Sequence, residues 1–121
     1  MPEIKLGEME AKFAEIIWKN DNIPSGELVK LCEKELNWKK STTYTMLRRL
    51  CEKGLFKNEN GKVTSLITKD ELAAQKGEEL IRESYGGSLP RFIASFTERK
   101  SLSKKELDEI QQMIDDYRKE S

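Results

Sequence analysis

The sequence predicts a mostly α-helical chain with one small β-hairpin, arranged as two lobes. Apolar residues recur at helical spacing through most of the 121 residues, and a strand-turn-strand pattern occurs around Asn60-Gly61. Hydrophobic and charged residues each make up 36% of the chain, which is lean for one compact core. We therefore expect an N-terminal lobe over residues 1–68 and a helical lobe over residues 69–121, the latter completed by a partner chain.

Two helices are expected at the start of the chain. Phe13, Ile16 and Ile17 recur at helical spacing and predict an amphipathic helix over residues 7–19. A second helix is expected over residues 25–35, where the Ser25 hydroxyl, directly after Pro24, is placed to cap free backbone N–H groups.

A third helix and a hairpin are expected next. The helix is predicted over residues 40–53, because Gly54 stands where a helix typically ends. Asn-Gly is a strong signal for a two-residue hairpin, although it also marks simple surface loops. Three helices with short connections followed by a hairpin predict a winged helix-turn-helix.

The second lobe is expected to hold three further helices. A helical pattern begins at Lys69 and is interrupted by Gly86-Gly87, after which Ser88 can start a short helix. Ser103 and Glu106 form a capping box that opens the last helix.

The apolar residues of the last two helices form narrow stripes that bury little surface within one small chain. Pairing with a second copy would cover these stripes, and folding back onto the same lobe is the alternative. The residues expected at a dimer interface are Leu89, Phe92, Ile93, Phe96, Leu107, Ile110, Ile114 and Tyr117.

The zero net charge of the chain conceals a local excess of positive charge. Residues 37–57 carry six basic side chains and only one acidic side chain, Glu52. A local field, more than net charge, decides whether a phosphate backbone is attracted. This stretch contains the predicted third helix, so nucleic acid is the expected partner.

The two faces of the third helix differ in chemistry. Thr43, Met46, Leu47 and Leu50 share one side and are expected to pack inward. The other side is rich in hydroxyls and arginine, which bond to base edges and phosphates. With two lysines at the helix start and two on the hairpin, the predicted DNA-binding residues are Lys39, Lys40, Ser41, Thr42, Tyr44, Thr45, Arg48, Arg49, Lys57 and Lys62.

Other classes of protein find little support in the sequence. The chain has no histidine, no phosphate-binding glycine loop and no nucleophile paired with a base, so we expect no enzyme, no cofactor and no metal site. Cys32 and Cys51 are expected to be small core residues. The chain lacks a run of 18 apolar residues and a signal peptide, so a cytoplasmic protein without membrane contact is expected. A winged helix that binds proteins, and a transcription activator, remain alternatives.

The segment WKKSTTYTMLRRLCEKGLFK resembles the penicillinase repressor family, which includes the BlaI, MecI and CopY repressors. The resemblance extends upstream through EMEAKFAEIIWK and downstream through GSLPRFIASFTERKSLSKKELDEI, so it covers nearly the whole chain. The residues that match the family pattern are Trp38, Ser41-Thr42, Thr45, Leu47, Arg49-Leu50 and Lys53-Gly54.

The resemblance implies a homodimeric repressor that binds a palindromic operator through its winged domains and dimerises through its C-terminal helices. In the β-lactam branch of the family, a sensor system leads to cleavage at an Asn-Phe bond, and Ser95-Phe96 stands at the matching position here. In the copper branch, a C-terminal cysteine cluster binds metal, whereas no cysteine follows Cys51 here. The resemblance therefore leaves the inducing signal, and any upstream sensor or protease, unidentified.

Overall fold

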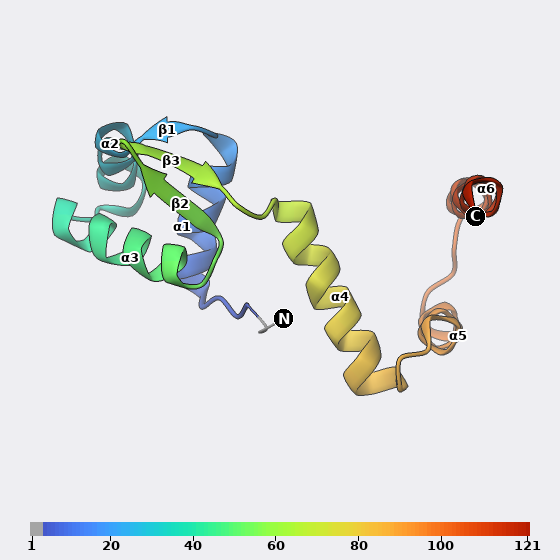
Figure 1. The fold of residues 1–121 in the computed structure, drawn as a ribbon. Helices are drawn as coiled ribbons and strands as arrows, with labels where there is room; N and C mark the ends of the chain where they lie inside the picture. The colour runs from blue at the N-terminus through green and yellow to red at the C-terminus, as the bar shows by residue number, and fades with distance from the viewer. Residues whose placement is uncertain (1–3) are drawn as a thin grey trace. The chain divides into compact units, whose positions relative to one another are not determined.

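A computed structural model describes residues 4–121 and confirms the mostly helical fold with a small hairpin (Figure 1). The chain divides into two compact units, which we call the N-terminal unit (Met1–Gly77) and the C-terminal unit (Glu78–Ser121). The elements, in chain order, are α1 (Glu8–Lys19), β1 (Ile23–Pro24), α2 (Ser25–Leu36), α3 (Lys40–Glu52), β2 (Phe56–Glu59), β3 (Lys62–Ser65), α4 (Lys69–Tyr85), α5 (Leu89–Arg99) and α6 (Lys104–Glu120).

Local signals fix where α3 ends. Gly54 adopts φ +89°, a left-handed conformation that is costly for residues with a Cβ atom. Its N–H donates to the Cys51 carbonyl over 3.0 Å, and the Leu55 N–H donates to the Leu50 carbonyl over 3.1 Å. These two bonds form a Schellman motif, so the predicted helix stop at Gly54 is confirmed.

The start of α2 differs from the prediction. Pro24 is the N-cap residue, and its position has no capping side-chain hydrogen bond. Ser25 is the first helical residue, and its Oγ lies 3.3 Å from the hydroxyl of Tyr44 on α3. The expected Ser25 cap is therefore wrong, because this hydroxyl bonds to α3 instead of to the backbone of its own helix.

The predicted hairpin is present and carries an additional strand. Asn60 (φ +53°) and Gly61 (φ +75°) form the two-residue turn between β2 and β3, as expected for a type I′ turn. β1 pairs antiparallel with β3, giving the strand order β1-β3-β2. Although only two residues long, β1 joins the segment before α2 to the hairpin.

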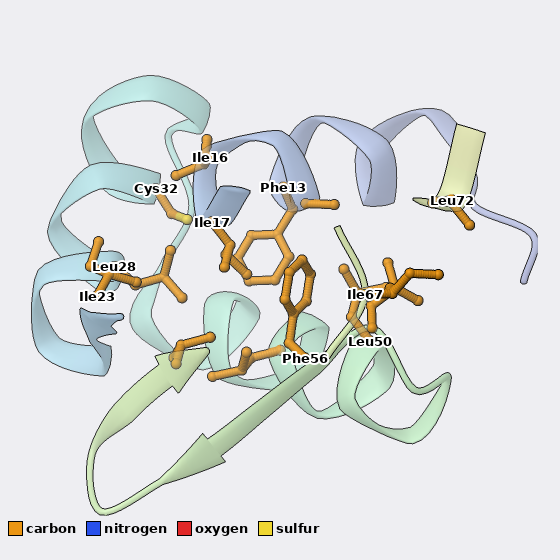
Figure 2. Packing of buried hydrophobic residues seen from close by; sticks show 14 residues of the cluster. Phe13, Ile16, Ile17, Ile23, Leu28, Cys32, Leu50, Phe56, Ile67 and Leu72 are labelled. Carbon is orange, nitrogen blue, oxygen red and sulfur yellow. The ribbon is translucent and has the colours of Figure 1, made fainter. Parts of the chain in front are cut away.

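The core of the N-terminal unit lies between the three helices and the hairpin (Figure 2). Phe13 and Ile17 of α1, Leu28 of α2 and Leu50 of α3 are fully buried, and Phe56 of β2 is 1% exposed. Complete burial of each such side chain contributes about 1.5–3 kcal/mol. All three helices and the hairpin therefore share one core, which packs these elements against one another.

The start of α4 belongs to the same unit. The indole Nε1 of Trp18 donates to the Ile67 carbonyl over 3.0 Å, and Lys69 forms a 2.8 Å ion pair with Glu15 on α1. Leu72 is 4% exposed and joins the core. These contacts fix the first turn of α4 against α1.

The C-terminal unit begins with the end of α4. Gly86 and Gly87 adopt φ values of +58° and +82° and break the helix as predicted. The Ser88 Oγ accepts a hydrogen bond from the Arg91 N–H and so caps α5. The predicted capping box of Ser103 and Glu106 at the start of α6 is also confirmed.

Few side chains of the C-terminal unit are shielded from solvent. The Phe92 ring contacts the rings of Tyr85 and Phe96, with centroid distances of 5.5 and 6.0 Å. No residue of α5 or α6 is buried. Among residues 4–121, no helix is long and apolar enough to cross a membrane.

Candidate nucleic-acid interface

One face of α3 holds the helix in the core. Thr43, Leu47 and Leu50 are at most 2% exposed, and Met46 is half-buried against the same cluster. α3 packs against both α1 and α2. The predicted inward side of the third helix is therefore confirmed.

The opposite face of α3 is open to solvent. Among the predicted DNA-binding residues on this helix, Tyr44 is half-buried, with its hydroxyl 3.3 Å from the Ser25 Oγ. Hydrogen bonding to Ser25 orients the Tyr44 ring against the start of α2. The exposed members are Lys40, Ser41, Thr42, Thr45, Arg48 and Arg49.

The N-terminus of α3 carries positive charge without an acidic cap. Lys39 is the N-cap residue, no side chain caps the first turn, and that turn contains no acidic residue. By contrast, α6 starts with a complete Ser103–Glu106 capping box. Free N–H groups, the helix dipole and the two lysines at positions 39 and 40 all favour an anion at this end of α3.

Not all the basic residues of this stretch contribute to the open surface. Lys53 forms a 2.8 Å ion pair with Glu10 and donates to the Lys5 carbonyl over 2.8 Å, so it ties α3 to the segment before α1. The Lys53 hydrogen bond, the Gly7 N–H and the positive charges of Lys53 and Arg49 lower the pKa of Glu10, and they outweigh the opposing effect of burial. Lys53 therefore acts as a structural cation.

The two predicted hairpin lysines occupy neighbouring strands. Lys57 on β2 forms a 2.6 Å ion pair with Glu59 on the same strand, with both side chains at least half exposed. Glu59 lies opposite Lys62 on β3, which is exposed. In the described part of the chain, Lys39, Lys40, Arg48, Arg49 and Lys62 form no ion pair within 4 Å.

The apolar residues predicted at a dimer interface lie on α5 and α6 and are largely exposed. Phe92 is half-buried, and the other seven are 40–74% exposed. Met113, which the predicted set omits, is 66% exposed on α6. It lies three residues after Ile110 and four before Tyr117, so it widens the apolar stripe of α6 on one side.

The structure offers little for metal or thiol chemistry. Residues 4–121 contain no cluster of three or more side chains that could hold a metal ion. Cys32 is buried, Cys51 is half-buried, and both are free thiols. Burial raises the pKa of each thiol, which keeps both in the protonated, unreactive form near neutral pH.

Comparison with known proteins gives a consistent result over nearly the full chain. A family model described as penicillinase repressor matches residues 6–116. The penicillinase repressor of Bacillus licheniformis is 30% identical, over 98% of this chain and 94% of its own length. The penicillinase repressor of Staphylococcus aureus is 22% identical over 97% and 96% of the two chains. The methicillin resistance regulatory protein MecI of Staphylococcus aureus is 20% identical over 91% and 93%.

Proposed function

The chain belongs to the penicillinase repressor family, a family of transcriptional repressors, and on that premise we propose that it occupies a palindromic operator as a homodimer. In this proposal α3 enters the major groove of duplex DNA. A homodimer has two-fold symmetry, and a palindromic operator matches that symmetry. Occupation of the promoter prevents transcription until a signal releases the protein.

The exposed face of α3 is the observation that carries this proposal. It presents hydroxyls and guanidinium groups, Ser41, Thr45 and Arg49 among them, without an acidic residue before Glu52. A face that binds protein would be expected to carry apolar residues here. In helix-turn-helix proteins the N-terminal part of the recognition helix contacts base edges. Thr45 lies at the centre of the exposed face and is the proposed reader of a base.

The hairpin and the start of α3 supply contacts to the DNA backbone. Lys39 and Lys40 lie at the uncapped helix N-terminus, which favours a phosphate. Lys62 on the hairpin is exposed and forms no ion pair within 4 Å among the described residues, and Lys57 would exchange its partner Glu59 for a phosphate. Such contacts position the protein on the duplex and carry no sequence information themselves.

Dimerisation through α5 and α6 explains why large apolar side chains of these helices are exposed in the single chain. Joining two reading heads makes the second half-site contact effectively intramolecular, which raises avidity by roughly 10²–10⁴. Separation of the two C-terminal units would therefore release the operator without changing α3. The protein acts where the chromosome lies, in the cytoplasm of a bacterial cell, and it acts by binding and not by catalysis.

The Ser95-Phe96 bond differs from the bond that is cut in the β-lactam branch of the family. It lies within α5, and the Ser95 Oγ is 3.2 Å from the Tyr85 hydroxyl. The β-lactam branch of the family is cut at an Asn-Phe bond, and Ser95 stands at the position of that Asn. We therefore propose that release does not begin with cleavage at this bond.

Binding of selected duplexes by the full-length protein tests the function. Sites are selected from a random-sequence library, and affinity for the selected and random duplexes is measured by fluorescence anisotropy. Thr45→Val, which removes the hydroxyl and keeps the shape, should weaken binding to the selected site by about 1–3 kcal/mol. Thr45→Ser, which keeps the hydroxyl, should weaken it less.

Two results would contradict the proposal. A wild-type protein that binds selected and random duplexes equally well would not be a sequence-specific repressor. Thr45 variants with unchanged affinity and unchanged base preference would remove the centre of the α3 face from the interface. Lys34→Gln, at an exposed position of α2, controls for loss of a surface group.

A further inference from the structure

A cleft lies between α3 and the first strand of the hairpin. It is lined by Tyr44, Leu47, Arg48 and Cys51 from α3 and by Asn58 from β2, and its volume is about 270 Å³. Figure 1 shows β2 running beside α3 in the N-terminal unit. Asn58 was not among the residues predicted to bind DNA, because no sequence motif connects it to α3.

The floor of the cleft is apolar and its rim is polar. Leu47 is 2% exposed, and Cys51 and Tyr44 are half-buried. Arg48 and Asn58 are exposed and stand on opposite sides of the opening, one on the helix and one on the strand. The cleft thus combines a largely buried base with two exposed side chains that can donate hydrogen bonds.

Arg48 gives the lining of the cleft a positive charge, although Glu52 lies near enough to act on Cys51. No acidic residue lines the cleft, and Arg48 forms no ion pair within 4 Å among the described residues. The half-buried Cys51 thiol stays protonated, since burial raises its pKa, so it adds no negative charge. A guanidinium and a side-chain amide facing one opening form a donor set that suits a phosphate oxygen.

We propose that this cleft receives one phosphodiester group of the DNA backbone, held by the Arg48 guanidinium and the Asn58 amide. The inference rests on the proposed function, because a duplex seated on the exposed face of α3 would pass between that helix and the hairpin lysines. Arg48 belongs to the exposed face of α3 and Asn58 belongs to the hairpin, so the cleft adjoins both of these surfaces. Arg48 is thereby a positioning residue and not a base reader, which separates its role from that of Thr45.

Variants of the full-length protein test the cleft with two probes, a duplex selected from a random library and an unselected duplex. Arg48→Gln should weaken binding to both duplexes by the same factor, about five- to twentyfold at 0.1 M salt. It should also reduce the slope of log affinity against log salt concentration by about one. Arg48→Lys should restore the slope, because a phosphate accepts a point charge as well as a planar fork.

Asn58→Ala tests the contribution of the side-chain amide. This variant should lower the affinity for both duplexes about two- to fivefold. It should not change the slope of log affinity against log salt concentration, because the amide is neutral. In the Arg48→Gln/Asn58→Ala double variant the loss should differ from the product of the single losses, since both groups hold one phosphate. Lys34→Gln, which removes a positive charge from an exposed site on α2, should not reproduce the Arg48→Gln pattern.

Three results would overturn the assignment while leaving the proposed function intact. Arg48→Gln could weaken only the selected duplex and leave the salt slope unchanged, which would make Arg48 a base reader. Additive losses in the double variant would separate Asn58 from the Arg48 phosphate. Millimolar inorganic phosphate could shift the NMR signals of Arg48 and Asn58 while both variants bind DNA normally, which would make the cleft a site for small anions. Failure of the wild-type protein to bind any duplex would instead contradict the proposed function itself.

Discussion

The N-terminal and C-terminal units solve the problem of burying apolar surface in opposite ways. In the N-terminal unit, Phe13, Leu28 and Leu50 are fully shielded by three helices and a hairpin of the same chain. In the C-terminal unit, Ile93 and Ile110 remain 45% and 40% exposed, and neither α5 nor α6 has a buried residue. The first unit covers its apolar core with its own elements, whereas the second presents apolar surface that a single chain leaves open. The N-terminal unit thus holds the buried core, and the C-terminal unit holds the apolar surface through which we propose that two chains associate.

The largest effect is expected when an acidic residue replaces an apolar residue in the exposed stripe of α6. Ile110→Glu should prevent dimerisation, because a carboxylate would be buried without a partner in the paired state. Affinity for the complete operator should fall by roughly 10²–10⁴, since avidity is lost. Sedimentation gives the oligomeric state, and anisotropy on full and half operators gives the affinities.

The half operator provides the control for this variant. Binding of Ile110→Glu to a half operator should match that of the wild-type protein, because α3 is unchanged. A dimeric Ile110→Glu protein with full operator affinity would show that the α6 stripe lies outside the interface.

A core truncation should act on the other unit. Leu47→Ala is expected to lower the free energy of unfolding by roughly 2–5 kcal/mol, because Leu47 is 2% exposed and its removal leaves a cavity. Urea unfolding followed by circular dichroism measures the change. Met113→Ala, at a side chain 66% exposed on α6, should have a much smaller effect in a monomeric background. Equal losses from the two variants would contradict the difference between the units.

Acid should weaken the N-terminal unit through Glu10. Its folded-state pKa lies below the ordinary value of 4.5, chiefly because of the Lys53 hydrogen bond. The stabilisation from the Glu10–Lys53 pair is thus fully present above the pKa of Glu10 in the unfolded chain. It is lost as the pH falls through the pKa of Glu10 in the folded chain. Glu10→Gln should cost about 1 kcal/mol at pH 7 and flatten the loss of stability below pH 4.5.

Chemical unfolding as a function of pH measures this dependence. Glu8→Gln is the matched control, because its ion pair with Lys12 is long, at 3.9 Å, and its side chain is 86% exposed. A pH profile of Glu10→Gln that parallels the wild-type profile would show that the Lys53 pair does not contribute.

The smallest effect is expected at Thr43. Its hydroxyl is buried on the inward face of α3 and has no hydrogen-bond partner that meets normal geometry. Thr43→Val keeps the shape and removes the unsatisfied group, so stability should be unchanged or rise by up to about 1 kcal/mol. Thermal unfolding measures this change, and a loss above 1 kcal/mol would reveal a bond between Thr43 and the neighbouring Cys32 thiol.

Features with a local cause were predictable from the sequence. Asn60-Gly61 specifies its turn, Gly54 ends α3, and Ser103 with Glu106 caps α6, each through backbone bonds within a few residues. The inward face of α3 followed from helical periodicity alone. Each of these features depends on residues that are close together in the sequence, so the sequence alone specifies it.

Features that join distant segments were not predictable. β1 has two residues, one of them Pro24, and its pairing with β3 spans nearly 40 positions, so no local pattern marks it as a strand. Ser25 was expected to cap its own helix, but Tyr44 lies close enough in the fold to compete for its hydroxyl. In the sequence Lys53 is one of the six basic residues of the stretch 37–57, but in the structure it pairs with Glu10. In the candidate site, Asn58 joins Arg48 only because the hairpin lies beside α3.

NMR titration of the full-length protein with its selected duplex tests the central claim most directly. Backbone and side-chain signals of residues 39–49 should shift or broaden most, followed by those of residues 57–62 on the hairpin. The signals of the apolar residues on α5 and α6 should not change, because the protein is expected to be a dimer before DNA is added. Unchanged signals for Ser41, Thr45 and Arg49 in a saturated complex would show that the exposed face of α3 does not enter the groove.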